Sequence, residues 1–157
     1  MSVESVRRYL ADFGLENRVA EFTESSATVE LAAAVVGVIP ARIAKTLSFL
    51  SPDGKAFLIV AAGDAKIDNR KFKDYFGFKA KMLSPQEAID LVGHAVGGVC
   101  PFAVKENVTV YLDKSLQRFE TVFPAAGSSS SAVELNCDEL FESSRAKEWI
   151  DCCKLPE

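Results

Sequence analysis

The sequence predicts an α+β fold built from short helices and short strands in mixed order. Segments whose apolar residues are spaced three and four apart are typical of helices, and short apolar runs bounded by glycine, proline and aspartate are typical of strands. The two kinds of segment alternate along this chain. Two of these runs are joined by Ser51-Pro52-Asp53-Gly54, which is a strong hairpin signal. Ser84-Pro85-Gln86-Glu87 is a full capping box with proline at the first helical position, so it opens a helix.

In the first half of the chain, most expected elements carry their own boundary signal. The expected helices are residues 3–13 ended by Gly14, 29–36 capped by Thr28 and ended by Gly37, 40–44 opened by Pro40, and 69–76 capped by Asp68 and ended by Gly77. The expected strands are residues 19–22, 46–50 and 56–62. The last two form the predicted hairpin.

The second half continues the mixed order. Strands are expected at residues 79–83, 108–112 and 121–123, and a helix at 85–92 that ends at Gly93. Asp113 caps a short helix that runs to residue 119, and residues 127–131 form a turn before the apolar segment 132–135. A terminal helical region is expected to start at Asp138, with Phe141, Trp149 and Ile150 as its apolar contacts.

The composition is that of a globular protein with a sizeable core. The chain has 157 residues, which fits one domain over residues 1–157. Hydrophobic residues make up 48% and charged residues 25%, and no apolar run approaches the ~20 residues that span a bilayer. Charged residues interrupt the N-terminal segment too often for a signal peptide. We therefore expect a cytoplasmic protein with no membrane partner.

Charge and cysteine content exclude two further classes of protein. The net charge of −4 argues against a duplex-DNA binder with a broad basic face. The four cysteines show no C-x-x-C spacing, and His94 is the single histidine, so no zinc site is expected. Free thiols are the default in a reducing cytoplasm, and we expect neither a metal nor a cofactor.

The segment Gly93 to Phe102 is the most informative stretch of the chain. It holds three glycines and a proline between an expected helix and an expected strand. Glycine lets the backbone approach a ligand closely, so such a loop can direct its N–H groups at a carbonyl oxygen or an oxyanion. The alternative is a tight structural turn, which an isolated glycine-rich loop would favour.

Several short motifs follow one another along the chain: Val35 to Leu47, Gly63-Asp64, Asp68, Gly93 to Phe102, Val110 to Asp113, and Ala126 to Ser128. In this order they resemble the YbaK/EbsC family, also called the prolyl-tRNA synthetase-associated domain, over about residues 22–140. The resemblance implies a mixed, partly closed β-sheet surrounded by helices. It also implies hydrolysis of the ester between a wrong amino acid and the 3′ end of a tRNA.

The same resemblance implies a set of site residues. Lys45 takes the position of the family's key lysine, where an ammonium group can hold a phosphate or ribose hydroxyl or assist proton transfer. Gly97-Gly98-Val99-Cys100-Pro101 matches the family's Gly-x-x-x-Pro loop, with the N–H groups of Gly98, Val99 and Cys100 assigned to the substrate carbonyl. The residues expected to line or shape the pocket are Phe22, Thr28, His94, Gly127 and Ser128.

Two assignments have a simpler alternative beside the functional one. Cys100 lies inside the loop and is a possible nucleophile, but the family does not require cysteine there, so a small apolar pocket residue is favoured. The densest basic stretch is either a solvated helix face or a contact for the tRNA acceptor stem. The residues assigned to tRNA in this stretch are Lys66, Arg70, Lys71 and Lys73.

The leading hypothesis is a trans-editing aminoacyl-tRNA deacylase acting on alanine or cysteine attached to proline tRNA. Its nucleophile would be a water molecule or a substrate group such as the terminal ribose hydroxyl. Mischarged tRNA is the implied partner, with prolyl-tRNA synthetase as a second. The alternatives are a non-catalytic tRNA- or synthetase-binding module with the same fold, and a cysteine-dependent hydrolase or redox protein that uses Cys100.

Overall fold

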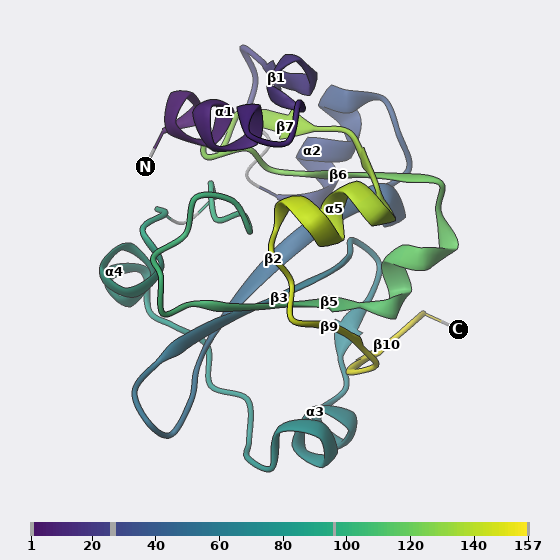
Figure 1. The fold of residues 1–157 in the computed structure, drawn as a ribbon. Helices are drawn as coiled ribbons and strands as arrows, with labels where there is room; N and C mark the ends of the chain where they lie inside the picture. The colour runs from purple at the N-terminus through teal and green to yellow at the C-terminus, as the bar shows by residue number, and fades with distance from the viewer. Residues whose placement is uncertain (1, 26–27, 96, 157) are drawn as a thin grey trace.

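A curled, mixed sheet of six strands forms the centre of the protein (Figure 1). The computed structural model describes residues 2–25, 28–95 and 97–156. In spatial order the strands are β8 (Leu135–Asn136), β6 (Thr121–Pro124), β2 (Ile43–Leu50), β3 (Ala56–Ala62), β5 (Thr109–Asp113) and β9 (Glu148–Ile150). The β2–β3 hairpin and the β6–β8 pair are antiparallel, whereas β2–β6, β3–β5 and β5–β9 are parallel.

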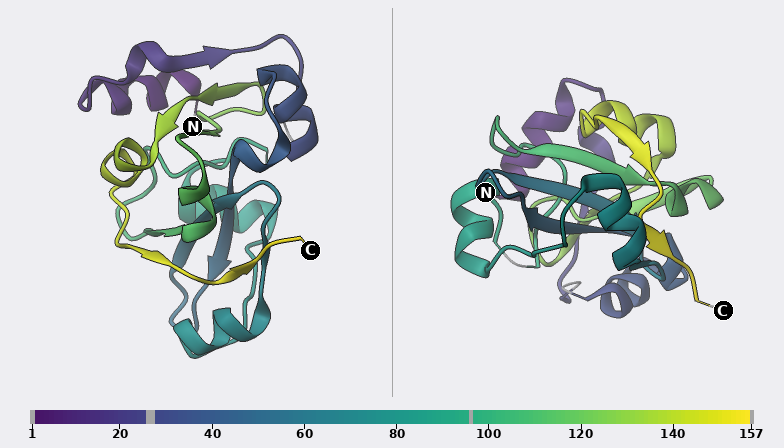
Figure 2. Two further views of the ribbon diagram at one scale, coloured as in Figure 1. Left: turned by 90° about the vertical axis from the view of Figure 1, so that its right-hand side faces the viewer. Right: turned by 90° about the horizontal axis from the view of Figure 1, so that it is seen from below.

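Two small antiparallel pairs flank this sheet. β1 (Val19–Glu21) pairs with β7 (Ser131–Val133), beside α1 at one end of the molecule (Figure 1). β4 (Lys66–Ile67) pairs with β10 (Cys153–Lys154), which brings the C-terminal segment against the residues that follow the hairpin. Figure 2 shows the C-terminal segment, in yellow, from two further directions.

Helices lie around the sheet on several sides (Figure 2). The α-helices are α1 (Val3–Ala11), α2 (Val29–Val36), α3 (Asn69–Phe76), α4 (Pro85–Glu87) and α5 (Cys137–Ser143). The helix of α4 continues as a π-helical turn over Ala88–Val92, and 3₁₀ turns cover Glu16–Arg18, Pro40–Arg42 and Lys114–Arg118. No helix in the described part of the chain is long and apolar enough to cross a membrane.

The caps explain where the helices begin and end. The Thr28 hydroxyl accepts a hydrogen bond from the Leu31 N–H, and Asp68 accepts from two backbone N–H groups at the start of α3. Gly37 ends α2 in the left-handed conformation at φ 86°, which glycine adopts without steric cost. These boundaries agree with those predicted from the sequence.

The core is built on β3, every residue of which is buried. A strand that is covered on both faces reads as a continuous apolar run, and residues 56–62 are such a run. On one face, the ring of Phe72 from α3 packs against Phe49 and Phe57 at centroid distances of 5.2 and 6.1 Å. Aromatic contacts of this kind anchor α3 on the sheet.

Two element predictions before residue 84 need correction. The helix opened by Pro40 ends at Arg42, because Ile43 already pairs with Phe123 in the sheet. Residues 79–83 form no strand of their own and make a single bridge, between Phe49 and Met82. The capping box at residue 84 starts a helix directly afterwards, which leaves no room for a longer ladder.

The C-terminal region also differs from the prediction. The last helix starts at Cys137 with Asn136 as its cap, rather than at Asp138. Trp149 and Ile150 belong to β9 and pair with the edge of β5, so they are not contacts on a continuing helix. The helix stops because the backbone at Arg145 turns to φ 53°, which no helix accommodates.

Candidate functional site

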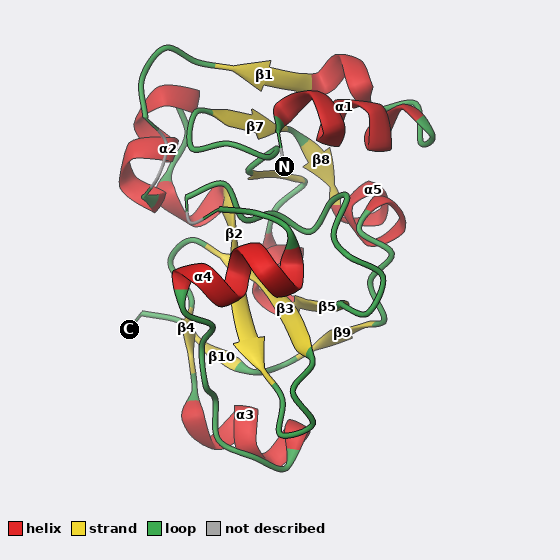
Figure 3. Cartoon of the chain, turned by 90° about the vertical axis from the view of Figure 1, so that its left-hand side faces the viewer, coloured by secondary structure: helices red, strands yellow, loops and turns green. Residues whose placement is uncertain are grey.

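A cavity of about 430 Å³ is lined by residues of β2, of α2 and of the segment around α4. Figure 3 shows how these three elements are arranged. The lining of the cavity is largely apolar, and the small residues in it come from several elements. The lining residues are Thr28, Val29, Ala32, Ile43, Ala44, Lys45, Thr46, Leu47, Ser48, Met82, Leu83, Pro85, Ala88, Gly97, Val99, Phe123, Ala125, Ser131 and Ala132. Lys45 and the glycine-rich loop, which are 52 residues apart at Lys45 and Gly97, therefore meet at one site.

Lys45 is held in place by the turn that follows β3. Its Nζ donates hydrogen bonds to the carbonyl oxygens of Ala65 and, at 3.3 Å, of Gly63. Burial lowers the pKa of Lys45 from its ordinary value, and the nearby thiol of Cys153 and the carboxylate of Asp64 oppose this shift. The side chain is thus a fixed cation at the cavity wall rather than a mobile surface lysine.

Position 63 requires glycine because Pro40 and Val29 pack directly against its Cα atom. A Cβ atom there would lie 2.1 Å from the carbonyl oxygen of Pro40 and 2.7 Å from the side chain of Val29. Gly63 therefore allows the segment before β2 to pack on the turn that holds Lys45. The carboxylate of the next residue, Asp64, pairs with Arg118 at 2.6 Å and fixes the turn from the other side.

The glycine-rich loop contributes Gly97 and Val99 to the cavity wall. The Gly98 N–H donates to the carbonyl oxygen of Ala95 at 3.0 Å, so the assignment of this group to a substrate oxygen is corrected. Within the described residues, the N–H groups of Val99 and Cys100 have no protein acceptor. The loop thus has two backbone donors in place of the predicted three.

Gly98 is instead the contact between the loop and the turn at residues 127–128. A Cβ atom on Gly98 would lie 3.0 Å from Cα of Ser128 and 3.1 Å from the carbonyl of Gly127. Neither residue of this turn lines the cavity, so the turn supports the loop from behind. The predicted role of Gly127 and Ser128 in shaping the pocket stays a prediction.

His94 and Cys100 are buried behind the loop and do not line the cavity. Nε2 of His94 lies 2.8 Å from the carbonyl oxygen of Phe102 and 3.6 Å from the Cys100 sulfur. The imidazole therefore ties the start of the loop to its end. Of the roles predicted for His94, this position favours shaping the loop over contacting substrate.

Burial lowers the pKa of His94 below its ordinary value of 6.5. A histidine with a lowered folded-state pKa stabilises the fold above its unfolded pKa, and this contribution is lost as the pH falls through the folded value. We expect the free energy of unfolding to decrease from pH 6.5 downward, and to decrease less in His94→Gln. Because the chain has one histidine, its NMR titration is unambiguous. A midpoint at or above 6.5 would contradict this expectation.

Cys100 is an inert thiol in this position. It is fully buried, and burial raises its pKa to about 12. Since the thiolate is the nucleophilic form, the cysteine-dependent alternative has no support in the geometry.

We expect Cys100→Ser to keep most of the wild-type activity, because the backbone N–H of residue 100 is retained and a serine hydroxyl can donate to the Phe102 carbonyl. We also expect iodoacetamide to label Cys100 in the native protein far more slowly than after denaturation. Loss of hydrolysis to the spontaneous rate in a Cys100→Ser protein with an unchanged melting temperature would instead indicate a cysteine nucleophile.

The remaining predicted pocket residues divide into one that lines the cavity and one that does not. Thr28 lines it while also capping α2. Phe22 is half-buried, and its N–H donates to the carbonyl oxygen of Ser130 at 2.8 Å. It is not part of the cavity wall.

The four residues assigned to tRNA lie outside the cavity. Lys66 is in β4, and Arg70, Lys71 and Lys73 are in α3. Lys71 is paired with Asp151 at 3.0 Å and also donates to the carbonyl of Cys153, so part of its charge is already neutralised. The other three make no ion pair within the described residues. The contact with tRNA stays a prediction.

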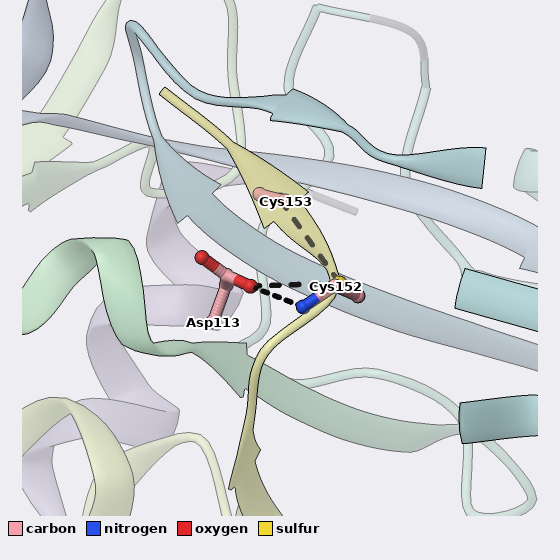
Figure 4. A group of neighbouring side chains, drawn as sticks. All are labelled: Asp113, Cys152 and Cys153. Atoms are coloured by element: carbon pink, nitrogen blue, oxygen red, sulfur yellow. Dashed lines mark hydrogen bonds between the residues drawn. The ribbon is translucent and has the colours of Figure 1, made fainter. Parts of the chain in front are cut away.

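Asp113, Cys152 and Cys153 are the described group that comes nearest to a set of metal ligands (Figure 4). One oxygen of the Asp113 carboxylate accepts from the Cys152 N–H at 3.0 Å, and the other from the Ser115 N–H at 2.9 Å. The hydrogen bond with Cys153 and burial raise the pKa of the Cys152 thiol, and the Cys152 N–H ties the C-terminal segment to β5 through Asp113. We therefore assign these residues to anchoring the C-terminal segment.

The cavity-lining residues missed from the sequence include those on β2 beside Lys45. Thr46 and Ser48 are small polar residues that line an otherwise apolar cavity. Their spacing of two within an otherwise largely apolar strand was the available signal. Phe123 in β6 and Ala125, which follows the end of β6, carried no signal in the sequence.

Comparisons with known proteins find a matching family and several relatives. The profile of the family called aminoacyl-tRNA editing domain matches residues 23–142. The Bacillus subtilis protein YwhH is 56% identical over 154 residues, which is 98% of each chain. EbsC of Enterococcus faecalis, named as a candidate Cys-tRNA(Pro)/Cys-tRNA(Cys) deacylase, is 25% identical over 73% of this chain and 70% of its own.

The fold has a solved counterpart. A crystal structure described as a candidate trans-editing enzyme for prolyl-tRNA synthetase superposes with a TM-score of 0.87 at 27% identity, covering 97% of this chain and 96% of the other. A proline–tRNA ligase of Thermosipho melanesiensis is 28% identical over 82% of this chain, which spans 22% of the ligase. The predicted fold, a mixed and partly closed sheet surrounded by helices, is confirmed.

Proposed function

The chain belongs to the aminoacyl-tRNA editing domain family, and we propose that it is a trans-editing deacylase that hydrolyses the ester of a mischarged tRNA. One observation carries this proposal. A fixed lysine ammonium and a loop with unpaired backbone N–H groups line the same cavity. The similarity to EbsC and to the trans-editing structure supports the same chemistry.

The proposed chemistry follows from how charge moves during ester hydrolysis. Attack on the carbonyl carbon places negative charge on the carbonyl oxygen, and donors aimed at this oxyanion lower the barrier by ~3 kcal/mol each. The N–H groups of Val99 and Cys100 take this role. Lys45, from the other side of the cavity, holds the terminal phosphate or a ribose hydroxyl.

The nucleophile is supplied from outside the protein in this proposal. His94 is bonded to the Phe102 carbonyl and Cys100 is a buried thiol, so neither can attack or activate an attacking group in the cavity. A water molecule fills this role, and the ribose oxygen of the ester leaves as a hydroxyl. The neighbouring ribose hydroxyl can hold this water in position, whereas its own attack would only move the aminoacyl group to the next ribose oxygen, and water would still be needed to release the amino acid. Hydrolysis assisted by a substrate hydroxyl requires positioning more than a protein base.

A small amino acid, alanine or cysteine on proline tRNA, is the proposed substrate. Ala32, Val99 and Ala125 are among the apolar residues that line the cavity. Hydrophobic fit distinguishes side chains by only ~1–3 kcal/mol per methylene, so we expect larger amino acids to be excluded by steric contact. Lys66, Arg70 and Lys73 are proposed to contact phosphates of the acceptor stem, and prolyl-tRNA synthetase is a proposed second partner.

Deacylation of a panel of charged tRNAs by the purified protein tests this function. Initial rates with Ala-tRNA(Pro), Cys-tRNA(Pro) and Pro-tRNA(Pro) should rank the two mischarged substrates above the correct one. The rates at limiting tRNA should fall with added salt, because phosphate contacts release counterions. Binding of tRNA without hydrolysis of any ester would instead support a non-catalytic binding module.

A further inference from the structure

One edge of β2 is open within the cavity. On this edge, β6 pairs with β2 only at Ile43 and Ala44, and its last residue is Pro124, which has no N–H to continue the ladder. Further along β2, the segment 81–83 hydrogen-bonds to the same edge, where the Leu83 N–H donates to the Ser48 carbonyl. Thr46 lies between these two neighbours.

The backbone of Thr46 points into this gap. In a strand, the N–H and C=O of one residue point to the same side, and successive residues alternate. The Ser48 carbonyl and the Leu50 N–H both bond the segment 81–83, so even-numbered residues of β2 point away from β3. Within the described residues, no group on this side bonds the N–H or the C=O of Thr46.

The side chain of Thr46 is also unsatisfied. Its Oγ1 atom is buried and has no hydrogen-bond partner in the described structure, although a buried hydroxyl without a partner costs stability. Rotation about the Cα–Cβ bond exchanges the positions of hydroxyl and methyl, and carries the oxygen between two staggered positions. Thr46 therefore offers the cavity a carbonyl oxygen, an N–H and a hydroxyl that the fold itself does not use.

We propose that this open edge binds the α-ammonium group of the aminoacyl ester, with the carbonyl oxygen and the hydroxyl of Thr46 as its hydrogen-bond acceptors. The proposal rests on the proposed function and deepens it, because it names the part of the substrate that β2 recognises. It applies to the free α-amino group that all aminoacyl esters share, and not to a particular side chain.

The charges around the cavity favour neutral acceptors for this ammonium. No aspartate or glutamate is among the lining residues of the described structure. The one charged lining residue, Lys45, is positive and projects from the opposite face of β2 to Thr46, since neighbouring strand residues alternate. A substrate that places its ammonium on the Thr46 side keeps the two positive groups apart.

Binding of a stable analogue tests the proposal without relying on hydrolysis. The probe is alanine joined through an amide to 3′-amino-3′-deoxyadenosine, prepared with a free and with an acetylated α-amine. Acetylation removes the charge and two donors, so we expect the dissociation constant of wild type to rise about tenfold. In Thr46→Val the free-amine analogue should bind about fivefold more weakly, and Thr46→Ser should restore most of its affinity.

Stability separates this role from a structural one. Because the hydroxyl has no partner in the fold, Thr46→Val should melt at or above the wild-type temperature. Thr109→Val, in β5 and outside the cavity, is the matched control and should leave binding of both analogues unchanged. A Thr46→Val protein that melts well below wild type and loses affinity for both analogues alike would overturn the proposal.

The outcomes for the two proposals are distinguishable. Equal affinity of wild type for the free and acetylated analogues, or no binding of either, would overturn the role of Thr46 even if the protein hydrolyses mischarged tRNA. A clear preference for the free amine in a protein that hydrolyses no ester would support the role of Thr46 and contradict the deacylase function.

Discussion

Replacing Lys45 with alanine is expected to lower the deacylation rate by about 100-fold or more while the protein stays folded. A preorganised charge at the site of reaction typically contributes a factor of this size. In the structure the Lys45 ammonium is fixed by two carbonyl oxygens of the turn at residues 63–65, so its position is set before substrate binds. Single-turnover hydrolysis of mischarged tRNA measures the effect.

A matched control is available in the same hairpin. Lys55 is exposed in the turn between β2 and β3 and does not line the cavity, so Lys55→Ala should keep the wild-type rate. Circular dichroism and melting curves show whether each variant is folded. A folded Lys45→Ala protein with a rate near wild type would remove Lys45 from the site.

The second large effect is expected for Gly98→Val. Its Cβ atom would meet the backbone of Gly127 and Ser128 at 3.0–3.1 Å, and backbone atoms cannot move aside as a flexible side chain can. The loop must shift, which carries the N–H groups of Val99 and Cys100 away from the carbonyl oxygen. We expect a fall of about 100-fold in the single-turnover rate, since losing one such donor costs this much.

Two comparisons decide whether that effect comes from the loop geometry. Cys100→Ser, in the same loop, keeps its backbone in place and should be far less damaging than Gly98→Val. Gly98→Ala makes the same Cβ contacts without the bulk of valine, so its single-turnover rate should lie between the rates of Cys100→Ser and Gly98→Val. If Gly98→Val and wild type have equal single-turnover rates, the loop is a structural turn and plays no part in catalysis.

Local signals were sufficient for most of the fold. The caps at Thr28, Asp68 and Ser84 fix the starts of their helices, because each satisfies backbone N–H groups within a few residues. The hairpin of β2 and β3 was predicted from the turn sequence at residues 51–54, which is also a local signal. Strands β4, β9 and β10 were not predicted, because strands of two or three residues exist only through the partner that they pair with.

The candidate site was predicted in part, because some of its residues belong to local sequence motifs. Lys45 and the loop are sequence motifs, and they do meet at one cavity. What the motifs do not contain is the direction of each group. The bond from the Gly98 N–H to Ala95, the burial of His94 and the open edge at Thr46 all depend on tertiary contacts. Sequence spacing carries no information about these.

The most direct test of the account is a single-turnover experiment with enzyme in excess over Ala-tRNA(Pro) or Cys-tRNA(Pro). Excess enzyme removes product release from the measurement, so the observed rate reports the chemical step in the cavity. The account predicts hydrolysis at least about 100-fold faster than the spontaneous loss of the amino acid, and a loss of this acceleration in Lys45→Ala. Hydrolysis of both esters at the spontaneous rate by folded wild-type protein would contradict it.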